Sequence, residues 1–240
     1  MFQKFYDSLL TLAYPQSCNV CEKSVEKSSD GVVCRVCWEQ TQIFRGDETL
    51  CDKCGRFLSD KPTDFKTFCH ECDEHFYDAV RAVGKYEKGL AASILNLKRE
   101  PVVAKYLQKL FVEAFQKTDF QNITKIIPVP LSKRRFLERG HNQAAVLSRI
   151  LAKETGIILD EHSLIRTKHT PIHRAGMDKK GREMSVEKAF EVKREKLIKG
   201  EKILLVDDVF TSGATASMCA KELKKKGADK VYIFTIARTV

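Results

Sequence analysis

The sequence has no hydrophobic run long enough to cross a membrane. The longest mostly apolar stretch near its start is Leu9 to Ala13, and Lys4 and Asp7 interrupt the residues before it. A membrane-spanning helix needs about 20 consecutive apolar residues. A secretion signal is not evident either. We therefore expect no membrane insertion and a location in the cytoplasm.

Acidic residues are also scarce relative to basic ones. The chain has 32 Asp and Glu against 42 Lys and Arg, which gives a formal net charge of +10. Such an excess favours anionic partners, either nucleic acid or phosphorylated metabolites, although a merely basic soluble protein is the alternative. With 240 residues and 43% hydrophobic composition, the chain can bury a core, and its length fits one medium domain with a small accessory one.

Cysteine, in contrast, is abundant. Eight of the nine cysteines form CxxC pairs, with spacers of 12 residues between the first two pairs and 14 between the last two. This spacing is typical of zinc ribbons, in which two CxxC turns complete a closed tetrahedral site. We therefore predict two structural Zn²⁺ ions, with sequential pairing favoured over a cross-braced arrangement. The predicted ligands are Cys18, Cys21, Cys34, Cys37, Cys51, Cys54, Cys69 and Cys72.

Three other residues near these motifs have simpler interpretations. His70 and His75 lie beside the last CxxC pair, but the complete four-cysteine sets make them surplus as ligands. The ninth cysteine, Cys219, falls inside a predicted helix without a partner motif. We interpret it as a buried, inert thiol.

The chain divides into three predicted segments. Residues 1–17 contain an amphipathic helix, Phe2 to Ala13, that Pro15 ends. Residues 18–76 are the double zinc-ribbon domain, which has few apolar runs of its own. Residues 77–240 alternate between strand and helix patterns.

The third segment predicts a parallel sheet covered by helices on both faces, which is an α/β fold. The predicted strands are Ala79–Tyr86, Ile126–Val129, a segment around His162–Arg166, Lys202–Asp208 and Val231–Ala237. The predicted helices are Lys88–Leu97, Pro101–Phe115, Asn142–Thr155 and Ala214–Lys226.

A phosphate-binding loop is predicted at the end of the strand that begins at Ile203. The hydroxyls of Thr211, Ser212 and Thr215 and the loop amides, including that of Ala214, can surround a phosphate at a helix N-terminus, and Gly213 allows close backbone approach. The alternative is a purely structural strand-turn-helix. The segment Ile203 to Thr215 resembles the phosphoribosyl-pyrophosphate (PRPP) motif of type I phosphoribosyltransferases.

Two carboxylates precede this loop. Asp207 and Asp208 are placed to accept hydrogen bonds from ribose hydroxyls, alongside a Mg²⁺ that also touches the pyrophosphate. We predict that these two residues carry any catalysis, and that PRPP and Mg²⁺ are the ligands.

A second signature runs from Ile127 to Gln143, IPVPLSKRRFLERGHNQ, and closely resembles the ComF family of competence-associated proteins. By this resemblance the turn after the strand holds pyrophosphate, with Ser132, Lys133 and Arg134 supplying a hydroxyl and cations and Arg139 completing the site. The alternative for Arg134 and Arg135 is a solvated basic face.

The ComF resemblance extends over nearly the whole chain, since such proteins join zinc-binding CxxC motifs to a phosphoribosyltransferase-type domain. It implies a cytoplasmic protein of DNA uptake in natural transformation, at the periphery of the membrane uptake machinery. It further implies action on single-stranded DNA beside a helicase-like ATPase of the ComFA type.

Three functional hypotheses stay open. The chain could bind PRPP and handle DNA or a partner, transfer phosphoribose to a nucleobase or amide acceptor, or use the zinc module for docking and the PRPP site as a sensor. Only 25 residues follow Thr215, too few for a C-terminal acceptor-binding hood. The basic stretch Lys168 to Glu187 is a predicted loop that could cover pyrophosphate or contact a nucleic-acid backbone.

Overall fold

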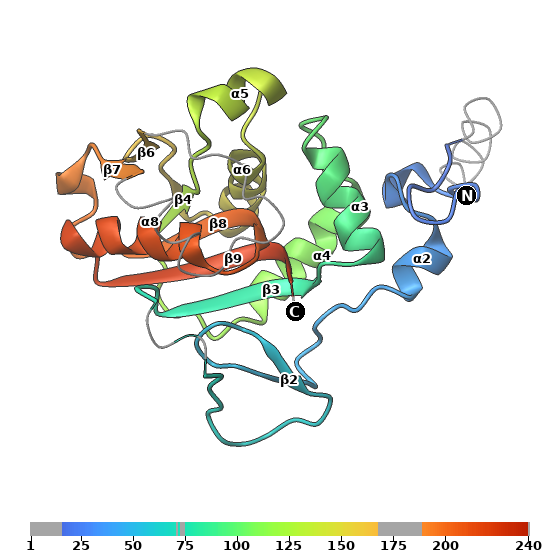
Figure 1. Ribbon diagram of the computed structural model, residues 1–240, viewed down its shortest axis with the longest axis horizontal. Coiled ribbons are helices and arrows are strands. Elements are labelled where there is room, and N and C mark those ends of the chain that lie inside the picture. Colours follow the sequence, from blue (N-terminus) through green and yellow to red (C-terminus); the bar gives the residue numbers. More distant parts are fainter. Residues whose placement is uncertain (1–15, 71, 73–74, 168–188, 240) are drawn as a thin grey trace.

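The structure of this protein is a computed structural model that describes residues 16–70, 72, 75–167 and 189–239. The predicted helix Phe2–Ala13 and the predicted basic loop 168–187 lie outside the described residues. The fold class expected from the sequence is confirmed: a parallel five-stranded sheet flanked by helices, with an N-terminal double zinc ribbon (Figure 1).

The main sheet has the strand order β3-β9-β8-β4-β5, and every neighbouring pair is parallel. Its strands are β3 (Ala79–Lys85), β4 (Lys125–Pro128), β5 (Ile158–Leu159), β8 (Lys202–Phe210) and β9 (Lys230–Arg238). In a parallel sheet all strands end at the same edge, and ligands bind beyond that edge.

Strand β8 lies at the centre because its side chains are apolar on both faces. Ile203 and Leu205 belong to one buried cluster, whereas Leu204 and Val206 belong to another on the opposite face. This two-residue alternation is the geometry of a strand, and burial on both faces is typical of a parallel sheet.

Helices cover both faces of the sheet. One face packs against α3, α4 and α6, and the other packs against α8 and a small antiparallel sheet of β6 and β7. The helices are α3 (Lys88–Leu97), α4 (Lys105–Gln116), α5 (Lys133–Arg139), α6 (Gln143–Thr155) and α8 (Ala214–Lys225), and the strands of the small sheet are β6 (Leu164–Arg166) and β7 (Phe190–Val192), with the short 3-10 helix η2 (Glu195–Leu197) after them. Figure 1 shows α5 standing away from the sheet, above α6.

The two zinc ribbons lie against different parts of this body. The first contains η1 (Ser28–Asp30) and α2 (Arg35–Glu39) and packs near α3 and α4, whereas the second contains the hairpin of β1 (Thr49–Leu50) and β2 (Phe57–Ser59) and lies below β3 in Figure 1. That the ribbons form one domain ending at residue 76 stays a prediction.

The chain between the ribbons covers the free edge of β3. Phe44 N donates to Val83 O at 2.8 Å and Lys85 N donates to Gln42 O at 3.0 Å. An added Cβ at Gly84 would collide with Gln42 O, so a glycine is required there. An exposed edge strand invites pairing with other chains, and this segment occupies the edge.

Helix α4 begins four residues later than the sequence predicted. Pro101 is not in the helix, because residues 101–104 are not helical and Ala104 is an extended N-cap with φ −60° and ψ 145°. Val103 is buried while Val102 is exposed. Alternating burial of this kind belongs to an extended backbone, so the apolar pattern of this segment was wrongly assigned to a helical stripe.

Two further expectations need correction. The strand around His162–Arg166 exists as β6, but it pairs antiparallel with β7 instead of joining the main sheet. The segment after β4, expected as a turn, forms helix α5. Across the described ranges, no helix has the length and apolar character needed to span a membrane.

Phe111 provides a test of the core. Its side chain is 0% exposed, and its ring centroid lies 4.8 Å from that of Phe234 on β9. We expect Phe111→Ala to lower the free energy of unfolding by about 3–5 kcal/mol, because it removes buried apolar surface and leaves a cavity. Urea denaturation measures this loss. Leu137→Ala, at a side chain that is 83% exposed, is the control and should change stability by less than about 0.5 kcal/mol. Equal losses in both variants would contradict the assigned core.

Candidate functional site

The predicted phosphate loop lies at the carboxyl end of β8. This strand continues two residues beyond Asp208 to Phe210. The predicted loop, Thr211 to Thr215, follows it and includes the first two residues of α8, which begins at Ala214. The loop amides therefore meet the positive end of a 12-residue helix, which is a suitable environment for a phosphate.

Gly213 is required by the shape of this loop. Its φ is 77°, in the left-handed region that other residues adopt only at a cost. An added Cβ would lie 2.7 Å from Cζ of Phe210 and 3.2 Å from Oη of Tyr77. The loop therefore rests directly on these two aromatic side chains.

A cavity of about 230 Å³ opens above the loop. Its lining includes Asp207, Asp208 and every predicted loop residue from Thr211 to Thr215. Four cations from three different parts of the chain complete it: Lys98, Arg135, Arg139 and Arg166. The site thus combines a phosphate loop, a carboxylate pair and a set of converging cations.

The two carboxylates differ in their surroundings. Asp208 forms an ion pair with Lys98, in which Nζ lies 3.4 Å from Oδ2. Asp207 accepts a hydrogen bond from Asp208 N at 2.8 Å. Burial, followed by the neighbouring charge of Asp208, raises the pKa of Asp207 well above its usual value.

Two of these cations repel each other through their charges. Burial lowers the pKa of Arg166, and the charge of Arg135 lowers it further. The Arg166 guanidinium also lies 5.2 Å from the ring centroid of Phe190. Two like charges held at one cavity favour a bound anion, because an anion relieves their repulsion.

Helix α5 separates the predicted cations into two groups. Arg135 and Arg139 line the cavity, whereas Lys133 and Arg134 are exposed, and Arg134 Nε pairs with Glu138 Oε1 at 2.8 Å. Ser132 is buried and caps α5, accepting a hydrogen bond from Arg135 N at 3.4 Å. Ser132, Lys133 and Arg134 are thus beside the cavity but not in its lining, and their contact with a ligand stays a prediction.

A polar network holds the α5–α6 junction. Arg139 Nη1 donates to Gln143 Oε1 at 2.7 Å. The two ring nitrogens of His141 lie 2.8 Å from Arg139 O and 2.7 Å from Leu97 O. Because Leu97 precedes Lys98, His141 ties the end of α3 to the Arg139 side of the cavity.

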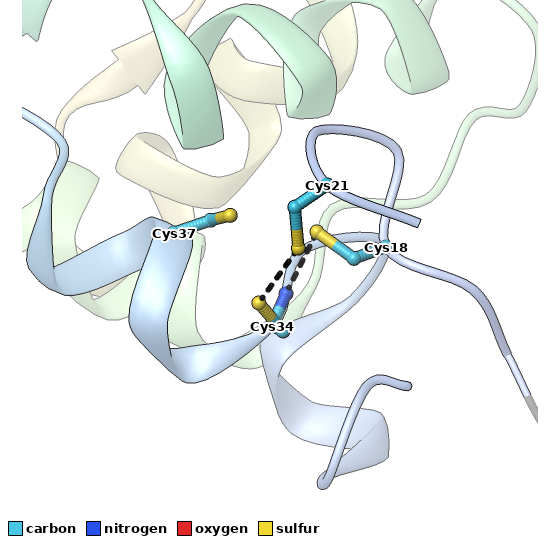
Figure 2. A group of neighbouring side chains, drawn as sticks. All are labelled: Cys18, Cys21, Cys34 and Cys37. Carbon is cyan, nitrogen blue, oxygen red and sulfur yellow. Dashed lines mark hydrogen bonds between the residues drawn. The ribbon is translucent and has the colours of Figure 1, made fainter. Parts of the chain in front are cut away.

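The eight cysteines form two groups of four with sequential pairing. In each group the sulfur atoms lie within 4.8 Å of one another. Figure 2 shows the first group, in which Cys37 on α2 points toward Cys18, Cys21 and Cys34, with Cys21 Sγ 3.6 Å from Cys34 Sγ. This spacing fits tetrahedral thiolate coordination of zinc, with Zn–S distances of about 2.3 Å.

Backbone amides prepare these thiols for metal binding. Cys34 N donates to Cys18 Sγ and Cys69 N donates to Cys51 Sγ, each at 3.3 Å. Burial raises the pKa of both acceptor thiols, but the backbone hydrogen bonds outweigh it and lower the pKa of Cys18 to about 6 and that of Cys51 to about 7. The thiolate is the metal ligand, so these amides favour binding.

The surplus residues behave as expected. Cys219 is 0% exposed, and burial raises the pKa of its thiol well above the usual value, as for an inert thiol. Neither His70 nor His75 belongs to a described metal group. His75 instead stacks on Tyr77, with 5.0 Å between ring centroids.

Two site residues were missed from the sequence. Lys98 and Arg166 come from segments with no recognisable motif, whereas Arg135 was weighed, together with Arg134, as a site cation against a solvated basic face. Lys98 follows the end of α3, and Arg166 is the last residue of β6 in the small antiparallel sheet. Only the tertiary structure shows that both side chains reach the same cavity.

The raised pKa of Asp207 predicts a stability effect. A carboxyl whose pKa is raised by folding stabilises the protein fully only below its usual value near about 4, and this contribution is lost as pH rises through the raised pKa. The amide that Asp207→Asn introduces cannot ionise. We therefore expect this variant to raise the free energy of unfolding at pH 7 by about 0.5–2 kcal/mol and to make that free energy depend less on pH. Urea unfolding between pH 4 and pH 8 measures this. Exposed Asp64→Asn is the control, and a loss of stability in Asp207→Asn would contradict the prediction.

Comparisons with known proteins found one family match and distant structural similarities. The model of the double zinc ribbon domain family matches residues 9–74. Among solved structures, the glutamine PRPP amidotransferase from B. subtilis has a TM-score of 0.36 at 15% identity, covering 74% of this chain and 33% of that chain. An adenine phosphoribosyltransferase from Thermoanaerobacter pseudethanolicus has a TM-score of 0.34 at 13% identity, covering 55% and 78%.

Sequence relatives cover nearly the whole chain. The DNA utilization protein YhgH of Shigella flexneri is 29% identical over 237 residues, which are 95% of this chain and 100% of the relative. Competence protein F of Haemophilus influenzae is 28% identical, covering 92% and 96%, and competence protein ComFC of Bacillus subtilis is 28% identical, covering 88% and 85%. These matches confirm the resemblance to the ComF family of competence-associated proteins.

Proposed function

We propose that this protein binds PRPP and handles single-stranded DNA during DNA uptake in natural transformation, together with a helicase-like ATPase of the ComFA type. The observation that carries the proposal is the cavity at the carboxyl end of β8, where four cations face a phosphate loop and two carboxylates. The names of the relatives, which refer to competence and DNA utilization, support the link to DNA uptake.

Each part of the cavity suits one part of PRPP. The loop Thr211 to Thr215 suits the 5-phosphate, since its amides and hydroxyls meet the N-terminus of α8. Asp207 and Asp208 suit the ribose hydroxyls. Arg135 and Arg166 suit the pyrophosphate, whose negative charge relieves their mutual repulsion.

Mg²⁺ fits the same site. Asp208 offers carboxylate oxygens on the cavity wall, and such oxygens are ligands that Mg²⁺ prefers. In the ion pair, Lys98 Nζ already contacts one oxygen of the Asp208 carboxylate. Binding of a metal by Asp208 would therefore free Lys98 to contact the pyrophosphate.

Calorimetric titration of PRPP with Mg²⁺ tests the ligand. We expect the wild type to bind, and Asp208→Asn to bind more weakly by about tenfold or more, because loss of a charged hydrogen-bonding partner costs about 1.5–3 kcal/mol. Asp119→Asn is the control, since Asp119 pairs with Arg81 away from the cavity. Absence of binding to the wild type would overturn the PRPP assignment. Assay of released pyrophosphate in the same mixture tests the alternative of phosphoribosyl transfer to a nucleobase or amide acceptor.

Substitutions on helix α5 test the DNA part of the proposal. We expect affinity for single-stranded DNA to fall with salt, with a slope of about −0.7 for each phosphate contacted. Lys133→Ala with Arg134→Ala should weaken binding and reduce this slope, because both exposed cations lie beside the cavity. Fluorescence anisotropy across a salt series measures both quantities.

A matched control uses helix α4. Lys105→Ala with Lys109→Ala removes two exposed cations, of which Lys109 has an i,i+4 partner in Glu113 as Arg134 has in Glu138. This variant should bind as the wild type does. Equal loss in both double variants, or binding that ignores salt, would overturn the assignment of α5.

A further inference from the structure

The second zinc site packs directly beneath the phosphate loop. Its four cysteines belong to the same buried cluster as Phe210, at the start of the loop, and Ala214, at its end. Tyr77, which follows the last CxxC pair, belongs to this cluster as well. The loop therefore rests on the zinc ribbon through a few side chains.

Aromatic contacts form the first connection. The Tyr77 ring meets the edge of Phe210, with 5.8 Å between centroids and 78° between ring planes. Gly213 sits on both rings so closely that an added Cβ would lie 2.7 Å from Phe210 and 3.2 Å from Tyr77 Oη. A shift of Tyr77 would therefore move the floor of the loop.

A hydrogen bond next to Tyr77 reinforces this connection. Phe76 N donates to Ser217 Oγ, at 3.2 Å, in the first turn of α8. The chain leaving the ribbon is thus tied to the helix whose N-terminus faces the cavity.

Arg238 forms the second connection. Its Nη1 donates to the carbonyl oxygen of Cys54, a predicted zinc ligand. Its guanidinium lies 5.2 Å from the ring centroid of Phe210, and the next residue, Thr239, donates its N–H to Phe210 O at 3.0 Å. A single buried side chain therefore joins the backbone of the zinc knuckle to the start of the loop.

Within the part of the chain that the structure describes, the first zinc site has no such connection to the loop. Cys18, Cys34 and Cys37 pack in the other buried cluster, against α3, α4 and the opposite face of the sheet. Among the described residues, that cluster contains no member of Phe210 to Ser217. The two zinc sites thus differ in their relation to the cavity.

We propose that the second zinc site and the phosphate loop form one coupled unit, with Tyr77, Phe210 and Arg238 as positioning residues. Zinc bound at Cys51, Cys54, Cys69 and Cys72 holds these side chains against the loop and raises its affinity for a phosphate ligand. Coupling of binding free energies is reciprocal, so the ligand in turn raises the affinity of this site for zinc and leaves the affinity of the first zinc site unchanged. The ligand part of this inference rests on the proposed PRPP site.

Zinc release from the intact protein tests the coupling. A chromophoric chelator, titrated to equilibrium with and without PRPP and Mg²⁺, reports the affinity of the protein for each of the two ions. We expect the ligand to raise the affinity for one of the two ions by about tenfold, which is within the usual range for coupled sites. An unchanged affinity for both ions, or an equal increase for both, would overturn the proposal.

Two arginine variants identify the connection. Arg238→Met removes the link to Cys54 O and to Phe210, and should abolish the ligand effect on zinc affinity while two zinc ions stay bound. Arg81→Met is the matched control, because Arg81 also donates to a carbonyl of the second ribbon, Asp52 O at 2.9 Å, and lies 6.0 Å from the centroid of Phe120, but does not contact the loop. It should keep the effect, and equal loss in both variants would contradict the role of Arg238.

Hydrogen exchange separates this inference from the ligand assignment. If PRPP does not bind the wild type, the coupling is still measured by amide exchange in residues 207–217 without ligand. Cys51→Ala with Cys54→Ala should speed exchange there by about tenfold, whereas Cys18→Ala with Cys21→Ala should not. Unchanged exchange in the first double variant, or equal change in both, would overturn the coupling even if PRPP binds.

Discussion

Burial of β8 on both faces is the constraint on which the rest of the structure depends. Leu204 and Val206 pack against α3, α4 and α6, while Ile203 and Leu205 pack against α8, so the strand can occupy only a central position. In a parallel sheet, a central strand ends at the same edge of the sheet as its neighbours. The two carboxylates near the end of β8 and the loop after it therefore lie at the edge of the sheet beyond which ligands bind.

Among the described residues, the lining of the resulting site contains four cations and two carboxylates. Asp208 pairs with Lys98, and the charge of Arg135 disfavours the charged form of Arg166. The fold tolerates this repulsion, together with a half-buried Asp207 whose charged form is also disfavoured. Groups that cost stability in the free protein are typical of sites that bind a charged ligand.

Local patterns explain why part of the site could be predicted. The loop Thr211 to Thr215 and its carboxylates lie in one short segment, and each CxxC turn brings two thiols together without help from the rest of the chain. Lys98 and Arg166 could not be predicted, because each is one cation among many in the sequence. The error at Pro101 has the same origin, since an apolar pattern of a few residues fits both a helix and an extended segment.

The sequence by itself determined the strand-loop-helix of the phosphate site, the two sets of four cysteines and the alternation that produces a parallel sheet. These features depend on contacts between residues that are near in the chain. Only the tertiary structure decided which cations reach the cavity and that the second zinc ribbon, rather than the first, supports the loop. Such contacts join residues as far apart as Cys54 and Arg238, and they follow from strand order and packing, which no local pattern encodes.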